Sequence, residues 1–437
     1  MHRRDFLKWM AAAAAGTAGT RLIDAAAQAA ASPAYFPVIL GQQEPAYQFP
    51  TPLSPSPTPT ALPTQTASPN PSPTATAVAT RTPTTPPIPS QTPTQAVPTA
   101  SPSSHRVVHI RSNAAHSWAG AQQSPAYWNY ANPTAIDEMT DQGLMALTNT
   151  SSPEAAWQAL LPGNISGKKV AIKVNFNSVT LCSESQGCID AVYEPVGSLV
   201  RGLKNRGVDP ANIWIYDAIK PIPERFAARA RIDGVLTFGE QRDKAAFTGP
   251  AVQFFAPGGV IAPDASNRLS NILVETDYLI NMPILKQHNG AGGFTGSFKN
   301  HFGSIQKPST LHAYINPVDG SRYSTAYNPM VDIYRSPQIL GKTILTVGDA
   351  IFAHRGGRGP SAWSTFGGQT PKSLFFSVDP VALDCVLMDF LNAETRAVHA
   401  EADRYLRLAA QTGLGLYERS DPWNTGYTQI NFVSQTL

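Results

Sequence analysis

The sequence predicts an α/β fold in which a mainly parallel sheet carries helices on both faces. Short apolar, β-branched runs alternate with stretches of helical periodicity from residue 105 onward, as expected for a covered parallel sheet. The stretch 105–437 is also long enough to bury a large core. We therefore expect one large domain rather than a small disulfide-stabilised module, a coiled coil or a repeat array.

The strands and helices can be placed in chain order from their periodicity. Pro380 directly follows Asp379, which suits a helix that starts at the proline with the aspartate as its N-cap. Apolar, β-branched runs predict strands at 106–110, 168–176, 212–217, 272–283, 342–350 and 373–379. Helical spacing of apolar residues predicts helices at 135–147, 191–205, 223–231, 296–305, 329–340, 380–391 and 400–412.

The first 30 residues predict a twin-arginine export signal. Arg3 and Arg4, followed by Phe6, Leu7 and Lys8, precede an alanine-rich stretch, which is the pattern of such a signal. The apolar stretch is too short and too rich in alanine to stay in a membrane, so we expect no transmembrane anchor in the mature chain. An uncleaved amphipathic helix is the alternative. The signal predicts an extracytoplasmic protein exported by the twin-arginine translocase.

Residues 31–104 predict a disordered linker rich in proline, threonine and serine. Many of the 39 prolines of the chain lie between Pro45 and Pro102, and Arg81 is the one charged residue of that stretch. The linker has too little apolar surface to offset the entropy of folding. Frequent proline favours extended polyproline II, so we expect a semi-rigid stalk before the α/β domain at 105–437.

Charge and cysteine content exclude several classes of protein. The formal net charge is +3 and the sequence has no basic run, so we expect no nucleic-acid partner. Three cysteines are too few for a disulfide framework or an iron–sulfur cluster held by this chain alone. Cys182 and Cys188 are spaced to form a local disulfide or to stay free. Cys385 lies in an apolar helical pattern and is expected to be buried.

Polar residues gather at the predicted strand ends. Lys173 and Asn175 alternate along one strand, so both side chains point to the same side of the sheet. Asp217, Asp349 and Asp379 each stand where an apolar run ends. Because ligands of open α/β sheets bind at the carboxyl ends of strands, these residues are candidates for a functional site.

The segment 279–305 has the highest density of residues that bind or transform ligands. It leaves a strand, crosses a glycine-rich turn and enters a helix. Glycines ahead of a helix expose backbone N–H groups and allow an anion to approach closely. The spacing matches neither a Walker phosphate loop nor a dinucleotide fingerprint. The segment predicts a site for a small anionic ligand, built from Lys286, His288, Gly292, Gly293, Gly296, Lys299 and Asn300.

These residue types suggest roles in catalysis and in binding. His288 and His312 are the candidate general bases or metal ligands. Asp217 and Asp349 would orient such a histidine or ligate the metal. The candidate substrate-binding residues are Lys173, Asn175, Lys286, Gly292, Gly293, Gly296, Lys299, Asn300, Arg355, Arg358 and Asp379.

Each candidate also has a purely structural interpretation. A buried Lys173 needs a carboxylate partner, which Asp217 or Asp349 would supply without any catalytic role. Aspartates at strand ends can cap helices or turns. Arg355 and Arg358 can be exposed charges of a loop.

An ordered set of motifs resembles the family known as domain of unknown function 362 (DUF362). The motifs are the Lys-x-Asn strand, the runs LINMPILKQH and TGSFKNHFG, a Leu-His pair ending at His312, Asp332 in a helix, VGDAIFAHRGGRGP and SVDPVALD. They span a core of about 169–385. The resemblance implies an α/β domain without an assigned reaction. Many members are associated with iron–sulfur clusters through appended cysteine motifs, and no CxxCxxC motif occurs in this chain.

Three functions compete on the sequence alone. The leading hypothesis is an exported enzyme that acts on a small anionic substrate at a pocket of lysine, histidine and aspartate residues. The second is a non-catalytic module for extracytoplasmic ligand binding or surface display. The third is a divalent-metal protein that uses Asp217, His288, His312 and Asp349.

Overall fold

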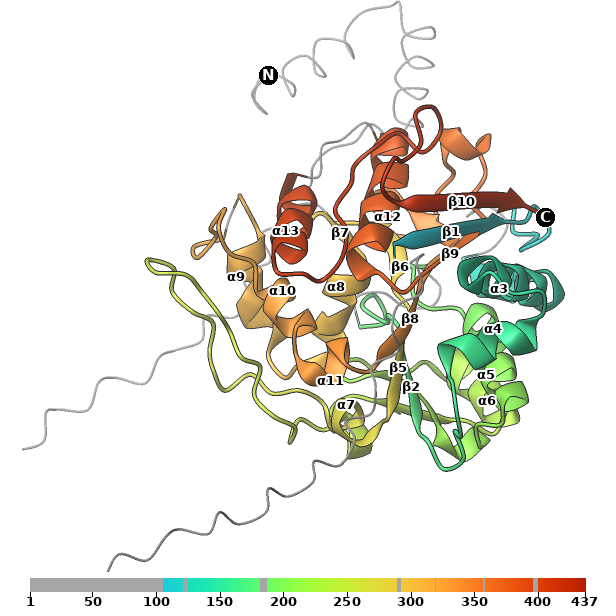
Figure 1. The fold of residues 1–437 in the computed structure, drawn as a ribbon, viewed down its shortest axis with the longest axis horizontal. Helices are drawn as coiled ribbons and strands as arrows, with labels where there is room; N and C mark the ends of the chain where they lie inside the picture. The colour runs from blue at the N-terminus through green and yellow to red at the C-terminus, as the bar shows by residue number, and fades with distance from the viewer. Residues whose placement is uncertain are drawn as a thin grey trace, which may run out of the picture. The chain divides into compact units, whose positions relative to one another are not determined.

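The structure, a computed structural model, describes residues 105–120, 125–180, 187–288, 292–318, 320–356, 358–395 and 400–437. The predicted signal at 1–30, the predicted linker at 31–104 and Cys182 lie outside the described residues. Within the described part, the strands form one ten-stranded sheet in the order β10-β1-β9-β8-β5-β2-β3-β4, with β6 paired to β8 and to β7 (Figure 1).

The sheet is mixed and mostly parallel. Strands β8, β5, β2, β3 and β4 run parallel to one another, whereas β9 runs antiparallel to β8 and to β1. The strands are β1 (Arg106–Arg111), β2 (Val170–Lys173), β3 (Ile213–Asp217), β4 (Leu236–Gly239), β5 (Tyr278–Asn281), β6 (Ile284–Gln287), β7 (Phe294–Thr295), β8 (Thr343–His354), β9 (Ser373–Ser377) and β10 (Asn431–Thr436).

Helices cover both faces of the sheet, which confirms the predicted fold class. In Figure 1, α3 to α6 lie on one side of β2 and β5, and α8 and α10 to α13 lie on the other. The helices of the first layer are α3 (Pro133–Thr148), α4 (Pro153–Leu160), α5 (Tyr193–Arg206) and α6 (Glu224–Ile232). Those of the other face are α7 (Asn271–Glu275), α8 (Ser297–Asn300), α9 (His312–Ile315), α10 (Pro329–Tyr334), α11 (Pro337–Leu340), α12 (Pro380–Thr395) and α13 (Ala400–Gln411).

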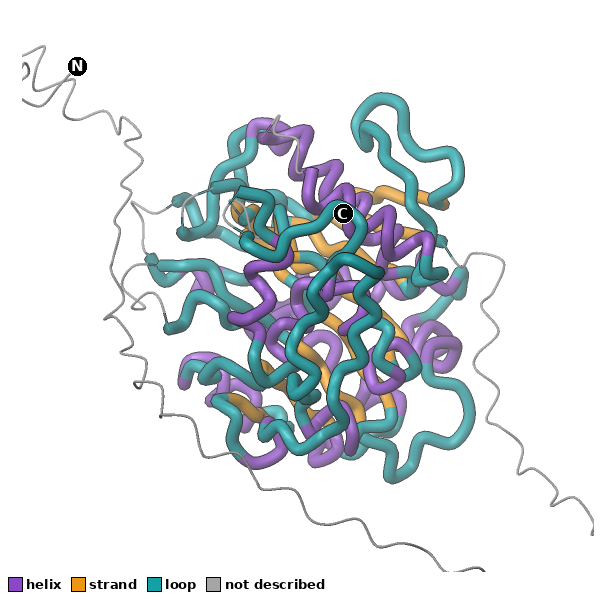
Figure 2. The backbone as a smooth tube through the Cα atoms, turned by 90° about the vertical axis from the view of Figure 1, so that its left-hand side faces the viewer, coloured by secondary structure: helices purple, strands orange, loops and turns teal. Residues whose placement is uncertain are grey.

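Two apolar cores follow from this layering. Alternate residues of β2 belong to different cores: Val170 and Ile172 pack toward α3 and α5, whereas Ala171 packs on the opposite side. Lys173 shares the side of Ala171, toward α8. Figure 2, turned so that the left-hand side of Figure 1 faces the viewer, shows long loops in front of the helices and strands.

The structure departs from the predicted elements in specific places. The predicted strand 272–283 begins as helix α7, because Ser270 leads into a short helical turn before β5 pairs with β2 and β8. The predicted strand ending at Asp349 continues to His354 as β8, since β9 and β6 both pair with its second half. Asp349 is therefore inside a strand rather than at its end.

The structure shows the state of two cysteines and of one predicted helix cap. Cys385 is a free thiol and fully buried, as predicted. Cys188 is disulfide-bonded. The Asp379 carboxylate accepts hydrogen bonds from the backbone N–H groups of Val381 (2.8 Å) and Ala382 (2.9 Å), which confirms its predicted role as N-cap of α12.

Candidate functional site

The strand order reverses between β2 and β5. Strands β3 and β4, which follow β2 in the chain, lie on one side of it in the sheet. Strands β5 and β8, which come later, lie on the other side. The carboxyl ends on either side of such a switch point are where open α/β sheets bind ligands. Lys173 ends β2 and Asn281 ends β5, and the two residues are direct register partners. Both side chains are fully buried.

Lys173 and Asp217 form a buried ion pair at this switch point. The Lys173 Nζ lies 3.3 Å from an Asp217 carboxylate oxygen. The same oxygen accepts a hydrogen bond from the Phe176 backbone N–H at 3.2 Å. Burial lowers the pKa of Lys173, and the Asp217 carboxylate opposes that shift. The carboxylate that the sequence offered as a catalytic group is thus engaged in holding Lys173.

A small residue beside the ion pair gives it room. A Cβ placed on Gly303 would lie 2.5 Å from the Lys173 Nζ and 2.7 Å from an Asp217 oxygen. The Gly303 carbonyl also accepts a hydrogen bond from the Ala218 backbone N–H at 2.8 Å. Gly303 is therefore required by the close approach of the chain to the pair.

Asn300 connects the two strands that flank the switch point. Its Oδ1 accepts from the Lys173 Nζ (3.4 Å) and the Asn175 Nδ2 (3.3 Å). Its Nδ2 donates to the Lys173 carbonyl (3.3 Å) and the Asn281 Oδ1 (2.8 Å). Both ends of the amide are occupied, so Asn300 orients the neighbouring polar side chains from α8.

Lys286 adds a second cation at the edge of this network. It lies on β6 opposite His354 of β8, and its Nζ donates to the Asn175 Oδ1 at 2.7 Å. Burial lowers the pKa of Lys286 to about 8, although the Asp190 and Asp217 carboxylates favour its charged form. The carboxyl of Asp190, itself buried, has its pKa raised to about 6 by burial and accepts from the Ser178 backbone N–H.

Lys299 is the third lysine of the site. It lies on α8, and burial together with the charge of Lys286 lowers the pKa of Lys299 to about 7. Gly292 packs against it: a Cβ on Gly292 would lie 3.4 Å from the Lys299 Cδ. Gly292 and Gly293 both have a φ of +75°, a conformation that favours glycine. The predicted glycine-rich turn therefore lies against a lysine.

Three histidines surround the lysines. His288 contacts the Thr295 hydroxyl through Nε2 at 2.5 Å. Burial, then the charges of Lys299 and Lys286, hold the pKa of His288 well below its usual value. His354 and His312 also have lowered pKa values, with burial as the main cause and Lys286 or Lys299 as a further one.

Exposure increases along this group of side chains. Lys173 is 0 % exposed, Lys286 3 % and Lys299 8 %. His288 is half-buried, and His312, at the start of α9, is exposed. A ligand would therefore reach the lysines from the side of His312. We call Asn175, Lys286, His288, Lys299 and His354 the switch-point cluster.

Several predicted site residues lie outside this cluster. Asp349 shares the opposite face of β8 with Val347 and Ile351, and its carboxylate accepts from the Ile351 backbone N–H at 3.0 Å. Burial raises the pKa of Asp349 to about 6. Asp379 caps α12 and contacts His105.

The two loop arginines also face other partners. Arg355 is exposed, and its Nε lies 3.2 Å from a Glu394 oxygen. Arg358 is exposed, and its carbonyl accepts from the Ile189 backbone N–H at 2.9 Å. The interpretation of these arginines as exposed loop charges fits this placement better than substrate binding.

The start of α8 already faces an internal carboxylate. Asp384, fully buried on α12, accepts from the Ser297 backbone N–H (2.7 Å) and the Ser297 hydroxyl (2.7 Å). A Cβ on Gly296 would lie 2.5 Å from an Asp384 oxygen. Burial raises the pKa of Asp384 to about 7. The N–H groups predicted to hold an external anion at Gly296 thus point to Asp384.

The side chains that could hold a metal ion or a cluster lie apart in the described part of the chain. Among the described residues no group of three or more histidine, cysteine, aspartate or glutamate side chains is placed to hold a metal ion. Cys188 is disulfide-bonded, and burial raises the pKa of the Cys385 thiol. These cysteines do not fit an iron–sulfur cluster.

Sequence reasoning missed four residues that shape the site. Asn281, Asp190, His354 and Asp384 all contact or face the predicted residues. Asn281 could have been recognised as a polar residue at the end of an apolar run. Asp190 carried no local signal, and the motif that contains Asp384 does not indicate its contact with Ser297, because both contacts arise between segments distant in the chain.

Comparisons with known proteins identify a family and an export signal. A family model described as a domain of unknown function, DUF362, matches residues 170–389. A model of the twin-arginine translocation signal sequence matches residues 1–20. No curated protein matches. In the part of the chain that the structure describes, no helix is both long enough and apolar enough to cross a membrane.

Two solved structures are similar at low identity. One is a crystal structure of a protein from Thermotoga maritima, with 16% identity, a TM-score of 0.33 and coverage of 64% of this chain and 59% of that one. The other is the lactate racemase apoprotein from Thermoanaerobacterium thermosaccharolyticum, with 15% identity, a TM-score of 0.30 and coverage of 49% and 48%. The chain thus spans about half to three fifths of the length of these structures.

Proposed function

This chain belongs to the DUF362 family and carries a twin-arginine export signal, and from that premise we propose that the exported protein is an enzyme for a small anionic substrate. The substrate would bind at the switch-point cluster through a carboxylate or phosphate group. The reaction class that the residues support best is proton transfer at a carbon next to that group.

The juxtaposition of two buried lysines at the switch point carries the proposal. Burial lowers the pKa of both Lys286 and Lys299, and the charge of Lys286 lowers the pKa of Lys299 further. An anion placed between them would favour both ammonium groups and remove that repulsion. Burying two lysines close together costs free energy that an anion bound between them would offset, which supports an anion site here.

The residues of the cluster divide into binding and proton-transfer roles. Lys286 is held by Asn175 at 2.7 Å, so it suits a fixed contact to the substrate anion. Lys299, with a pKa of about 7, can both accept and donate a proton near neutral pH. His288, whose pKa is far below its usual value, would act as a neutral imidazole that orients the substrate.

Lys173, Asp217 and Asn300 support the cluster rather than contact the substrate. Their hydrogen bonds are satisfied by one another and by the backbone. They fix Asn175, and through it the position of Lys286. In this proposal Asp217 is a positioning residue, and the general-base role predicted for His288 or His312 passes to Lys299.

Isotope exchange tests the proposal directly. The full chain is incubated in D₂O with a panel of small 2-hydroxy acids, 2-oxo acids and their phosphate esters, and loss of the proton next to the carboxylate is followed by NMR. We expect exchange with at least one compound and its loss in Lys299→Gln. Lys204→Gln is the matched control, because Lys204 makes an exposed ion pair with Asp233.

The outcomes separate the competing functions. Exchange that continues unchanged in Lys299→Gln would refute the assigned role of Lys299. Saturable binding that depends on Lys286, without exchange of any compound, would favour the non-catalytic ligand-binding module. Stoichiometric metal in the natively purified protein, measured by elemental analysis, would instead favour the divalent-metal protein.

A further inference from the structure

Helix α8 carries two residues of the site, and its first turn is capped from another helix. Lys299 belongs to the switch-point cluster, and Asn300 orients the side chains around it. The residue before the helix is Gly296, which has no side chain to accept the first backbone N–H groups. Asp384 of α12, which comes 87 residues after Ser297 in the chain, takes that role.

The Asp384 carboxylate holds the start of α8 by hydrogen bonds to its first two residues. One oxygen accepts from the Ser297 backbone N–H and from the Ser297 hydroxyl, both at 2.7 Å. The other oxygen accepts from the Phe298 backbone N–H at 3.5 Å and from the Tyr405 hydroxyl of α13 at 3.3 Å. Asp384 is fully buried, so bulk water does not compete for these hydrogen bonds. The carboxylate therefore ties α8 to both α12 and α13.

The glycine before α8 leaves room for this carboxylate. A Cβ on Gly296 would lie 2.5 to 2.6 Å from the carboxyl carbon and both oxygens of Asp384. The φ of Gly296 is −134°, an extended value that other residues also adopt, so the close approach is what requires a glycine. The Asn281 Nδ2 donates to the Ser297 carbonyl at 2.9 Å. Helix α8 is thus held between Asp384 and the end of β5.

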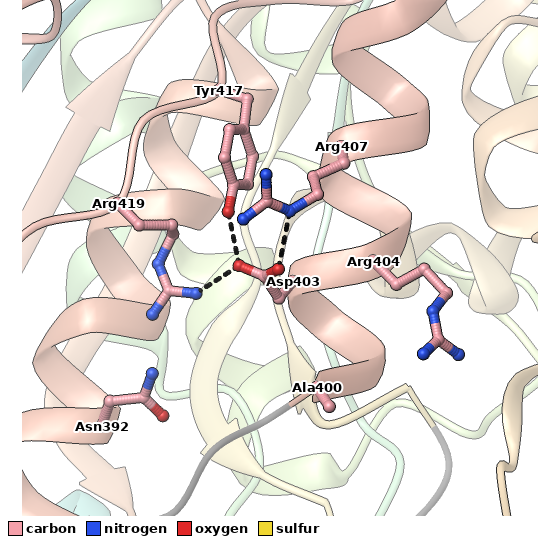
Figure 3. Close-up of a pocket in the computed structure, with 7 residues that line it drawn as sticks. All are labelled: Asn392, Ala400, Asp403, Arg404, Arg407, Tyr417 and Arg419. Carbon is pink, nitrogen blue, oxygen red and sulfur yellow. Dashed lines mark hydrogen bonds and ion pairs between the residues drawn. The ribbon is translucent and has the colours of Figure 1, made fainter. Parts of the chain in front are cut away.

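Ion pairs on the other side of α13 join the two helices that support Asp384. Arg419, in the segment after α13, lies 2.5 Å from Asp389 of α12 and 2.8 Å from Asp403 of α13. Figure 3 shows the pocket beside α13, in which the Tyr417 hydroxyl also reaches the Asp403 carboxylate. Asp384 therefore projects toward α8 from two connected helices.

We propose that Asp384 is a positioning residue of the switch-point cluster, which sets the place of Lys299 and Asn300 by capping α8 from α12. A helix of four residues has too few hydrogen bonds of its own to stay in place without such contacts. The motif SVDPVALD would then supply two caps, because Asp379 caps α12 and Asp384 caps α8. The role rests on the proposed function in one respect, since Lys299 is the acid–base group of that proposal.

The pH at which Lys299 reacts with a trace of acetic anhydride tests this role. Only the neutral amine attacks the anhydride, so the rate of Lys299 acetylation against pH, measured by peptide mass spectrometry, reports the protonation of that amine. In the wild type we expect a midpoint near the pKa of about 7. The titratable groups whose charges interact with Lys299 are Lys286, His288 and His312, and the variants leave all three in place.

Two variants break the contact from opposite sides. Asp384→Ala removes the cap, and Gly296→Ala pushes the carboxylate away from α8 without removing it. In both we expect the midpoint for Lys299 to move up by about one pH unit or more, because a loosened α8 lets water reach the amine. Asp384→Asn keeps an acceptor for the Ser297 backbone N–H, so it should restore the wild-type profile. Circular dichroism verifies that each variant folds.

Asp389→Ala is the matched control, because Asp389 lies on the same helix as Asp384 and is also buried. Its carboxylate likewise accepts from a backbone N–H and from a tyrosine hydroxyl, those of Ser420 and Tyr427, each at 3.0 Å. These contacts do not involve α8. The midpoint for Lys299 should therefore stay unchanged in Asp389→Ala.

The outcomes separate the role of Asp384 from the proposed function. An unchanged midpoint in folded Asp384→Ala and Gly296→Ala, or an equal shift in Asp389→Ala, would overturn the positioning role. If Asp384→Ala does not fold, Gly296→Ala alone decides. Absence of isotope exchange with every compound would count against the proposed function, whereas the Lys299 profile would still decide whether Asp384 positions that residue.

Discussion

The Lys173 ammonium lies 3.3 Å from the Asp217 carboxylate, and the two side chains are 0 % and 3 % exposed. The pair joins the ends of two neighbouring strands, β2 and β3, beside Gly303. Removing both charges from water is costly, and the ion pair and its hydrogen bonds offset that cost. The stability of the switch point therefore depends on both partners being present.

Removing one partner of this pair should destabilise the fold strongly. Asp217→Asn leaves the Lys173 ammonium buried without a carboxylate, so we expect a loss of about 3 kcal/mol in the free energy of unfolding. Urea denaturation measures it. The control is Asp277→Asn, because Asp277 pairs with Lys168 at 2.8 Å with both side chains 34% exposed. That change should cost less than about 1 kcal/mol, and similar losses in both variants would contradict the prediction.

Filling the space beside the pair should have a related effect. Gly303→Ala puts a Cβ within 2.7 Å of both charged groups, and the surrounding backbone leaves them little room to move. We expect a loss of about 1–3 kcal/mol in unfolding free energy, as for an overpacked core. Gly258→Ala serves as the reference, since nothing lies within 4 Å of the Cβ it would add. If the two alanines prove equally tolerated, the close packing at Gly303 has no energetic consequence.

Asp384 should make stability fall as the pH rises. Burial raises its folded pKa to about 7, above the ordinary value of 3.8, so the native state keeps a proton that the unfolded chain loses. The stabilisation is complete below about pH 4 and is lost as the pH rises through 7, with a slope of at most about 1.4 kcal/mol per pH unit. Asp384→Asn should remove this component. Unfolding free energies from pH 4 to 8 test it, and parallel curves for the variant and the wild type would refute it.

Anion binding at the switch-point cluster should weaken as the pH rises. Lys299 and Lys286 have pKa values of about 7 and 8, so both lose their charge between pH 6 and 9. Sulfate is the suitable probe because its own charge is constant over that range. Lys299→Arg keeps its charge and should give a flatter pH profile; an identical profile would exclude Lys299 from the site.

Part of the candidate site was predictable because local patterns carry it. The alternation of Lys173 and Asn175 predicted that both side chains lie on one side, and both contact the Asn300 Oδ1, although β2 ends at Lys173. Lys286, His288 and Lys299 were recognisable as polar residues flanking a glycine-rich turn. Asp379 was recognisable as a helix cap. The prediction that Asp349 ends a strand was wrong, because β9 and β6 extend the pairing of β8 past it.

The sequence by itself determined the α/β class, the export signal and the density of cations between β5 and α8, because periodicity and motif order are local properties. Only the tertiary structure decided which charges meet. It joined Lys173 to Asp217 rather than to Asp349, and it turned Asp384 toward the start of α8. These pairings depend on strand order and on helix packing across the sheet, and no short stretch of sequence encodes either. The physical reason is that a buried charge takes whatever partner the fold brings within hydrogen-bonding distance.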